Sequence, residues 1–91
     1  MDRFQKSEIV SSLEDMGGLV RSQRKASGLR IDDAAALCGV SVDLLSRLEN
    51  GRSGVSSERL LKVLDGLGLA MLIVDKSKAV KLAVHSSADH S

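Results

Sequence analysis

Aromatic residues and cysteines are almost absent from this sequence. Phe4 is the only aromatic residue, and there is no tryptophan or tyrosine. Proteins that bind single-stranded nucleic acid stack successive bases on aromatic side chains, so this shortage argues against a single-strand or RNA-binding module. The single cysteine, Cys38, cannot form an internal disulfide, and burial as a small hydrophobic residue explains it better than redox sensing.

Targeting and membrane-spanning patterns are also missing. The sequence contains neither a secretory signal peptide nor an apolar run of about 18 residues, the length needed to cross a bilayer. Together with the lone cysteine, this predicts a cytoplasmic protein in a reducing compartment.

Catalytic and metal-binding patterns are lacking as well. No serine has a histidine and a carboxylate in a recognisable arrangement, and the glycines form no phosphate-binding loop. His85 and His90 have only Asp89 as a nearby companion, which is too few ligands for zinc, so a solvated tail is the better interpretation. We expect a protein that is not an enzyme and that uses no metal or cofactor.

The residues that are present suit one small helical domain. A chain of 91 residues buries only about 60 to 65 % of its unfolded surface, which favours a dimer. Hydrophobic residues make up 43 % and charged residues 27 %, as in ordinary folded proteins. The net charge of +1 neither demands nor excludes a polyanionic partner, because the positions of the charges decide.

Apolar spacing and capping residues predict four helices. The first starts at Ser11, which has capping-box spacing to Glu14, and it ends at Gly28. Gly17 and Gly18 interrupt it at a cost of about 1 kcal/mol each. Its apolar face comprises Leu13, Met16, Leu19, Val20 and Gln23.

Two short helices follow, over residues 31–38 and 42–49. Gly39 closes the earlier helix and Ser41 caps the later one. The inward residues of the later helix are Leu45 and Leu48. Ser57 is expected to cap a fourth helix whose apolar residues are Leu60, Leu61, Val63, Leu64 and Leu67.

After the fourth helix the pattern changes to that of a strand. Residues 69–74 form a continuous apolar run of strand length, and a turn at residues 75–78 precedes a weak alternation at Val80, Leu82 and Val84. The chain then divides into an N-terminal extension (residues 1–10), a domain (residues 11–75, with its strand at residues 69–75) and a tail (residues 76–91). The tail is either disordered or a weak second strand.

The two short helices have the spacing of a helix-turn-helix motif. Only Gly39, Val40 and Ser41 separate them, and in DNA-binding proteins with this spacing the second helix enters the major groove. A compact helical domain can hold such a pair without binding DNA, so a protein-interaction module stays an alternative.

Residues 28–51 resemble the Xre/Cro-like family of phage repressors and bacterial regulators. The residues that carry the resemblance are Gly28-Leu29, Ala35, Gly39-Val40-Ser41 and Leu45-Ser46-Arg47-Leu48-Glu49-Asn50-Gly51. The resemblance extends over residues 19–69 and implies a mainly α, lambda-repressor-like (Cro/C1-type) fold, with Ala35 as the small residue where the two helices cross.

The two ends of the domain look like HipB-type antitoxins of HipBA toxin–antitoxin modules. The shared segments are Phe4-Gln5-Lys6, Leu13, Leu19-Val20-Arg21 and residues 69–75. This resemblance implies that two copies of the last strand pair across a dimer axis and that the dimer binds a palindromic operator in its own promoter. It also implies that the dimer holds a HipA-like serine/threonine kinase toxin inactive. The terminal tryptophan of some relatives is missing.

The apolar strand predicts a dimer by itself as well. A lone strand exposes unpaired backbone groups and invites aggregation, and a two-fold mate removes that hazard. The expected interface residues are Leu69, Met71, Leu72, Ile73 and Val74.

By the family pattern, the residues that face bases lie at the start of the third helix and one turn later. They are Ser41, Val42, Asp43, Ser46 and Arg47. Arg47 is suited to guanine O6 and N7, Val42 to a thymine methyl group and Asp43 to cytosine N4. Asp43 also repels phosphate, and the alternative is that Arg47, four residues later, neutralises it.

Phosphate contacts are expected from Arg30, Asn50, Arg52 and the amides at the starts of the second and third helices. Relatives carry a small capping residue and then a glutamine where this chain has Arg30 and Ile31. Arg30 can take over the phosphate contact that the glutamine makes in relatives, and Ile31 cannot. In similar repressors the positions of Arg24 and Glu49 form a partly buried ion pair.

These features together predict a dimeric, sequence-specific transcriptional repressor that is the antitoxin of a HipBA-like operon. The alternatives are a stand-alone phage or prophage repressor and an interaction module with weakened DNA binding.

Overall fold

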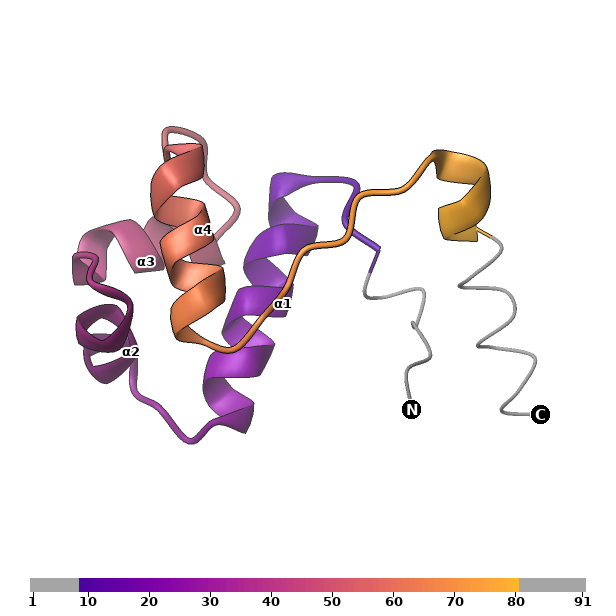
Figure 1. Cartoon of the computed structure of the whole chain (residues 1–91). Helices are drawn as coiled ribbons and strands as arrows, with labels where there is room; N and C mark the ends of the chain where they lie inside the picture. The colour runs from indigo at the N-terminus through magenta and orange to yellow at the C-terminus, as the bar shows by residue number, and fades with distance from the viewer. Residues whose placement is uncertain (1–8, 81–91) are drawn as a thin grey trace.

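The computed structural model describes residues 9–80, which consist mainly of four helices (Figure 1). In chain order they are α1 (Leu13–Ala26), α2 (Ile31–Cys38), α3 (Val42–Glu49) and α4 (Ser57–Gly66). Helix α1 packs against α3, and α2 packs against both α3 and α4. The mainly α fold is confirmed, and α2 and α3 have the bounds that the sequence predicts. No helix within the described range is long and apolar enough to cross a membrane.

The turn between α2 and α3 depends on Gly39 and Ser41. Gly39 has φ of 73°, a left-handed conformation that glycine adopts without strain. Ser41 is extended, and its hydroxyl oxygen accepts a hydrogen bond from the Leu44 amide at 3.0 Å. The short turn therefore ends α2 and starts α3 within three residues, as the sequence predicts.

Two helices begin one residue away from the expected cap. Ser12, and not Ser11, caps α1: its hydroxyl oxygen accepts from the Asp15 amide at 3.0 Å, while the Asp15 carboxylate accepts from the Ser11 amide at 2.9 Å. Likewise Ser56, and not Ser57, caps α4, accepting from the amide three residues later at 3.3 Å. Both corrections arise at paired serines, where either hydroxyl suits the capping role and only the backbone conformation distinguishes them.

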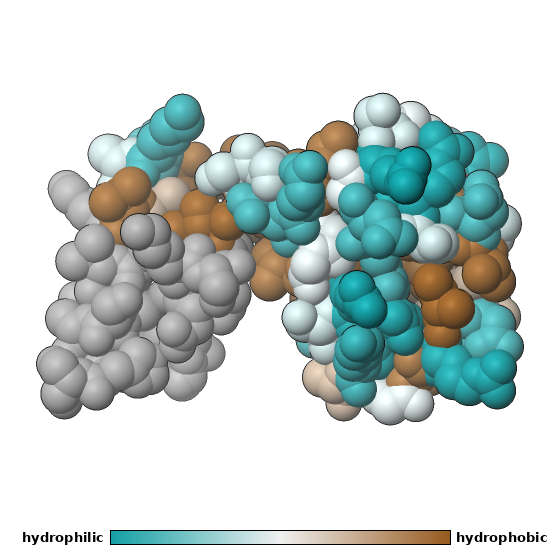
Figure 2. Space-filling model, turned by 180° about the vertical axis from the view of Figure 1, so that it is seen from behind, coloured by the Kyte–Doolittle hydropathy of each residue, from teal (hydrophilic) through white to brown (hydrophobic). Residues whose placement is uncertain are grey.

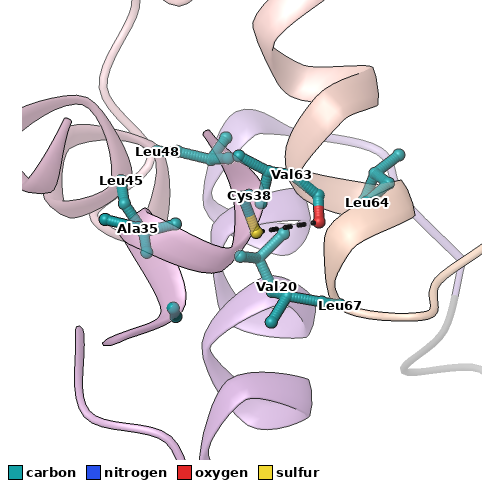
Figure 3. Close-up of a cluster of buried hydrophobic side chains, with 9 residues drawn as sticks. Val20, Ala35, Cys38, Leu45, Leu48, Val63, Leu64 and Leu67 are labelled. Atoms are coloured by element: carbon teal, nitrogen blue, oxygen red, sulfur yellow. Dashed lines mark hydrogen bonds between the residues drawn. The ribbon is translucent and has the colours of Figure 1, made fainter. Parts of the chain in front are cut away.

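The core lies where the four helices meet. Its central side chains, Val20, Leu45 and Val63, come from α1, α3 and α4 and are fully buried (Figure 3). The other buried hydrophobic residues are Ala34, Ala35, Cys38, Leu48, Leu64 and Leu67. Cys38 donates its thiol hydrogen to the Val63 carbonyl at 3.6 Å, and burial raises the pKa of this thiol. It behaves as a small core residue, as the sequence predicts.

Beyond α4, the chain runs extended through residues 69–75 and crosses α1 in the view of Figure 1. No strand pairing occurs within residues 9–80, so the predicted strand stays a prediction that concerns two copies of the chain. The turn expected at residues 75–78 is instead the start of a helical turn, residues 76–80. This result contradicts a hairpin starting at this turn; Leu82 and Val84 lie outside the described residues.

Asp75 explains the change from turn to helix. Its carboxylate accepts hydrogen bonds from the Ser77 hydroxyl at 2.7 Å and the Lys78 amide at 2.9 Å. These bonds, with that of Ser77 the stronger, hold the pKa of Asp75 below its ordinary value. Asp75 is thus a helix cap, a role for which aspartate is as well suited as it is for a turn.

Helix α1 approaches the end of α3 most closely at Gly17. This residue is buried, and a Cβ placed on it would lie 2.7 Å from the Glu49 carbonyl oxygen and closer still to that of Leu48. Gly18, by contrast, is exposed and has no atom near the position of a Cβ. Of the two adjacent glycines, only Gly17 is needed for packing.

We predict opposite effects for alanine at these two positions. Gly17→Ala should lower the free energy of unfolding by about 1 to 3 kcal/mol, because α1 must move away from α3. Gly18→Ala should raise it by up to about 1 kcal/mol through helix propensity. Urea denaturation followed by circular dichroism measures both. Equal effects of the two substitutions would contradict the close approach.

Candidate nucleic-acid interface

Helix α3 has one buried side and one exposed side. Leu45 and Leu48 point into the core. The expected base-facing residues lie on the other side: Ser41, Val42, Asp43 and Arg47 are exposed, and Ser46 is half-buried. The start of the helix therefore presents polar groups and one methyl-bearing side chain to the surroundings.

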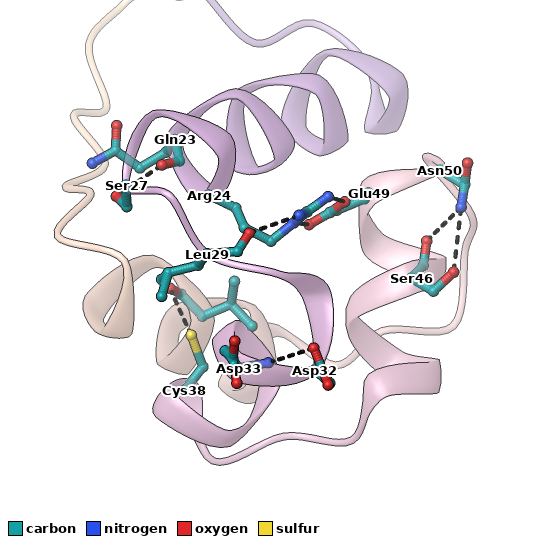
Figure 4. A network of polar contacts seen from close by, with 11 residues as sticks. Gln23, Arg24, Ser27, Leu29, Asp32, Asp33, Cys38, Ser46, Glu49 and Asn50 are labelled. Atoms are coloured by element: carbon teal, nitrogen blue, oxygen red, sulfur yellow. Dashed lines mark hydrogen bonds and ion pairs between the residues drawn. The ribbon is translucent and has the colours of Figure 1, made fainter.

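Arg24 and Glu49 join α1 to the end of α3 (Figure 4). The Arg24 Nε and Nη2 atoms donate to the two carboxylate oxygens of Glu49 at 2.6 and 2.9 Å, and Nη1 donates to the Leu29 carbonyl at 3.0 Å. The two side chains are 11 % and 5 % exposed. The hydrogen bond with Glu49 raises the pKa of Arg24, so the guanidinium stays charged. This is the pair of positions that the sequence analysis singles out.

The described part of the structure does not contain the ion pair between Arg47 and Asp43 that the sequence offers as an alternative to base reading. Arg47 Nη2 donates to the Ser53 carbonyl oxygen at 3.0 Å. Among the ion pairs of the described residues, none joins Arg47 to Asp43. Asp43 is therefore exposed at the first turn of α3 without that partner.

The expected phosphate-binding residues lie around the helix ends. Arg30 precedes α2, with its side chain 80 % exposed and Nε 3.4 Å from Asp32. Ile31 packs against the core. Asn50 donates its side-chain amide to the Ser46 carbonyl at 2.7 Å and so closes α3 (Figure 4). Arg52 is exposed.

Comparison with known proteins places this geometry in a family. Residues 15–71 match the sequence model of a helix-turn-helix domain. The uncharacterized HTH-type transcriptional regulator y4mF of Sinorhizobium fredii is 37 % identical over 65 residues, which are 71 % of this chain and 86 % of the relative. The chain belongs to the helix-turn-helix family of DNA-binding transcriptional regulators.

Solved structures have the same fold as this helix-turn-helix regulator. A chain of a HipA–HipB–O2–O3 complex superposes with a TM-score of 0.69 at 23 % identity, covering 80 % of this chain and 99 % of the other. A HipB–O4 20mer complex gives the same values. The clp gene regulator ClgR from C. glutamicum has a TM-score of 0.59 at 29 % identity, with 87 % and 91 % of the two chains covered.

The expected dimer residues of this regulator divide into two groups. Leu69 packs against the core, and Val74 is half-buried. Met71, Leu72 and Ile73 are 44 %, 63 % and 84 % exposed. Hydrophobic surface is visible along this connection in Figure 2. Three consecutive exposed apolar side chains on an unpaired extended segment are unusual for a protein surface.

Two contacts that shape the helix-turn-helix domain are not predicted by the sequence. Gln23, assigned only to the apolar face of α1, donates its side-chain amide to the Leu67 carbonyl at 3.0 Å and so ties α1 to the end of α4. The Arg47 contact with Ser53 is the other. The glycine at position 54 is the one signal in the sequence that hints at an unusual loop there.

Removing the carboxylate of the buried pair should destabilise the domain. We expect Glu49→Ala to lower the free energy of unfolding by about 3 to 5 kcal/mol, because it leaves the largely buried Arg24 charge without its carboxylate. Glu49→Gln, which keeps the side-chain shape and one acceptor oxygen, should cost less. The control is Asp65→Ala on the exposed side of α4. This substitution should change the free energy of unfolding by less than about 0.5 kcal/mol. Thermal unfolding that gives Glu49→Ala the melting temperature of the control would contradict this assignment.

Proposed function

We propose that this regulator is a repressor that binds an inverted-repeat operator in its own promoter as a symmetric dimer. The observation that carries the proposal is the exposed start of α3. The Arg24–Glu49 pair joins the other end of this helix to α1 and so fixes its position. In helix-turn-helix proteins the corresponding end of the second helix contacts base edges in the major groove. Two such helices in a dimer meet half-sites about 10 to 10.5 base pairs apart.

Base recognition is assigned to the exposed side of α3. Val42 is 44 % exposed and offers methyl groups to a thymine methyl. Asp43 is free of an ion pair with Arg47 and accepts a hydrogen bond from cytosine N4. The hydroxyl groups of Ser41 and Ser46 can serve either as donors or as acceptors.

Phosphate binding is assigned to the helix ends. Arg30, Asn50 and Arg52 are all exposed, and each belongs to a loop or cap next to α2 or α3. Such contacts set the register of a protein on the duplex and carry no sequence information. Arg30 has to exchange its weak contact with Asp32 for a phosphate, which costs little because both side chains are solvated.

Residues 69–75 are the proposed dimer interface. The exposure of Met71, Leu72 and Ile73 supports this assignment, because pairing with a second copy removes both the apolar surface and the unpaired backbone groups. Leu69 anchors the segment on the core of its own protomer. The position of the recognition helix relative to the two-fold axis then follows from this anchor.

The proposed partner is a HipA-like serine/threonine kinase toxin, which makes the regulator the antitoxin of its operon. The support is the likeness in fold to a chain of the HipA–HipB–O2–O3 complex, together with the resemblance of residues 69–75 to HipB-type antitoxins. The second candidate is a repressor without a toxin. The likeness to ClgR, described as a clp gene regulator, favours it.

Shortening or charging the extended segment should abolish the dimer. A chain truncated after Gly68 and the full-length variant Ile73→Asp should both sediment as monomers at micromolar concentration. Ile73 is 84 % exposed, so the aspartate does not disturb the protomer core. Leu37→Asp, at an exposed position of α2, is the matched control and should stay dimeric. A truncated chain that remains dimeric in analytical ultracentrifugation would refute the interface.

Binding to the promoter should depend on salt and on Arg52. In a fluorescence titration with the DNA upstream of its own gene, log K should fall linearly with log salt concentration, because phosphate binding releases counterions. Arg52→Ala should reduce the slope by about one, while Lys62→Ala, at an exposed position of α4, should leave it unchanged.

The same titration distinguishes the candidates. Equal affinity for a scrambled duplex would exclude a specific repressor and favour an interaction module. Repetition with the purified product of the neighbouring gene, where that gene encodes a kinase, separates an antitoxin from a stand-alone repressor.

A further inference from the structure

The side chain of Arg47 is bound by the loop that follows its own helix. Arg47 Nη2 donates to the Ser53 carbonyl oxygen at 3.0 Å, and the guanidinium lies against Gly54. A Cβ on Gly54 would stand 2.5 Å from Nη2. Gly54 also has φ of 92°, a conformation that other residues rarely adopt. The backbone conformation therefore favours glycine at this position, and a side chain here would displace the end of the Arg47 side chain.

The contact holds the middle of the α3–α4 loop, residues 50–56. At the start of the loop, the Gly51 amide donates to the Leu48 carbonyl at 3.1 Å and the Arg52 amide to the Arg47 carbonyl at 3.0 Å. Toward its end, Val55 is half-buried against the core. Between these anchors the Arg47 side chain fixes Ser53. Arg52, the proposed phosphate contact, thus lies between Gly51 and Ser53, which are both hydrogen-bonded to α3.

This engagement competes with a role for Arg47 in reading guanine, because one of the five guanidinium N–H donors is already bound to the loop. Such a contact needs two guanidinium donors directed at O6 and N7 of the base. Here Nη2 is directed at the protein backbone, in a hydrogen bond that is strengthened by the positive charge.

We infer that Arg47 is a positioning residue that holds the α3–α4 loop beside the recognition helix. It keeps Arg52 in a fixed register with the base-contacting start of α3, and it leaves Asp43 free to accept a hydrogen bond from a base. This inference rests on the proposed DNA binding. It replaces the guanine contact that the sequence suggests for Arg47.

The first test needs no DNA. In ¹⁵N relaxation measurements on the free protein, Arg47→Ala should lower the backbone order parameters of Ser53 and Gly54 from about 0.85 to below about 0.6, while those of α1 and α4 stay unchanged. Arg47→Lys, which keeps one charged donor, should give intermediate values. Unchanged order in Arg47→Ala would overturn the inference whether or not the protein binds DNA.

The second test separates positioning from base reading. The wild type and Arg47→Ala are each used to select sequences from a pool of randomised duplexes. We expect the same base preferences for both and about tenfold weaker binding of every sequence by the variant. Relaxed preference for guanine at one base pair, or unchanged affinity, would overturn the inference. Absence of any selection by the wild type would refute the proposed function instead, and the relaxation data would then decide the role of Arg47 in the loop.

A double-mutant cycle links the effect to the contact. Gly54→Ala should weaken DNA binding, and its combination with Arg47→Ala should weaken binding by less than the sum of the two effects, because the double variant loses the steric conflict with the guanidinium and keeps only the backbone strain. The control is Gly28→Ala. Gly28 has a similar positive φ of 71° and no atom near the position of a Cβ, so its effect should add to that of Arg47→Ala. Additive effects for the Gly54 pair would overturn the inference.

Discussion

The whole domain depends on the close approach of α1 to the end of α3. Gly17 lets the backbones of the two helices come into contact. Further along α1, the Arg24–Glu49 pair joins the same two helices. A helix of eight residues is not stable alone, since isolated helices shorter than about 12 to 15 residues are marginal in water. Helix α3 therefore depends on packing against its neighbours, and its contacts with α1 fix the orientation of the surface that it presents.

The charges around the recognition helix are mixed. Arg30, Arg47 and Arg52 lie near its ends, but Asp32 is next to Arg30 and Asp43 occupies the first turn of α3. With a net charge of +1, the chain has little of the general attraction to phosphate that gives basic proteins their non-specific affinity. In the proposed dimer, specific contacts and the doubling of sites then supply most of the affinity. For this reason the accurate placement of a few side chains, including those of the α3–α4 loop, matters more here than total charge.

The proposed dimer and the proposed DNA contacts are coupled through α1. The extended segment starts at Leu69, which packs on the core, and becomes exposed at Met71. Because Gln23 binds the Leu67 carbonyl, α1 holds the point at which the segment leaves the domain. The helix that orients α3 therefore also orients the proposed dimer segment. In the proposed dimer, a change in the position of α1 would alter the distance between the two copies of α3 as well as the stability of each.

The sequence alone determined the features that depend on neighbouring residues. The bounds of α2 and α3, the turn at Gly39 and the buried leucines of α3 all follow from spacing and capping within a few positions of the chain. Paired serines at the starts of α1 and α4, and Asp75 after the extended segment, were misjudged because several residues suit the same local role. Only the tertiary structure decided the close approach at Gly17, the contact of Gln23 with Leu67 and the partner of Arg47. Two of these join residues far apart in the sequence, and the third depends on a loop whose path is set by its anchors, so no local pattern could specify them.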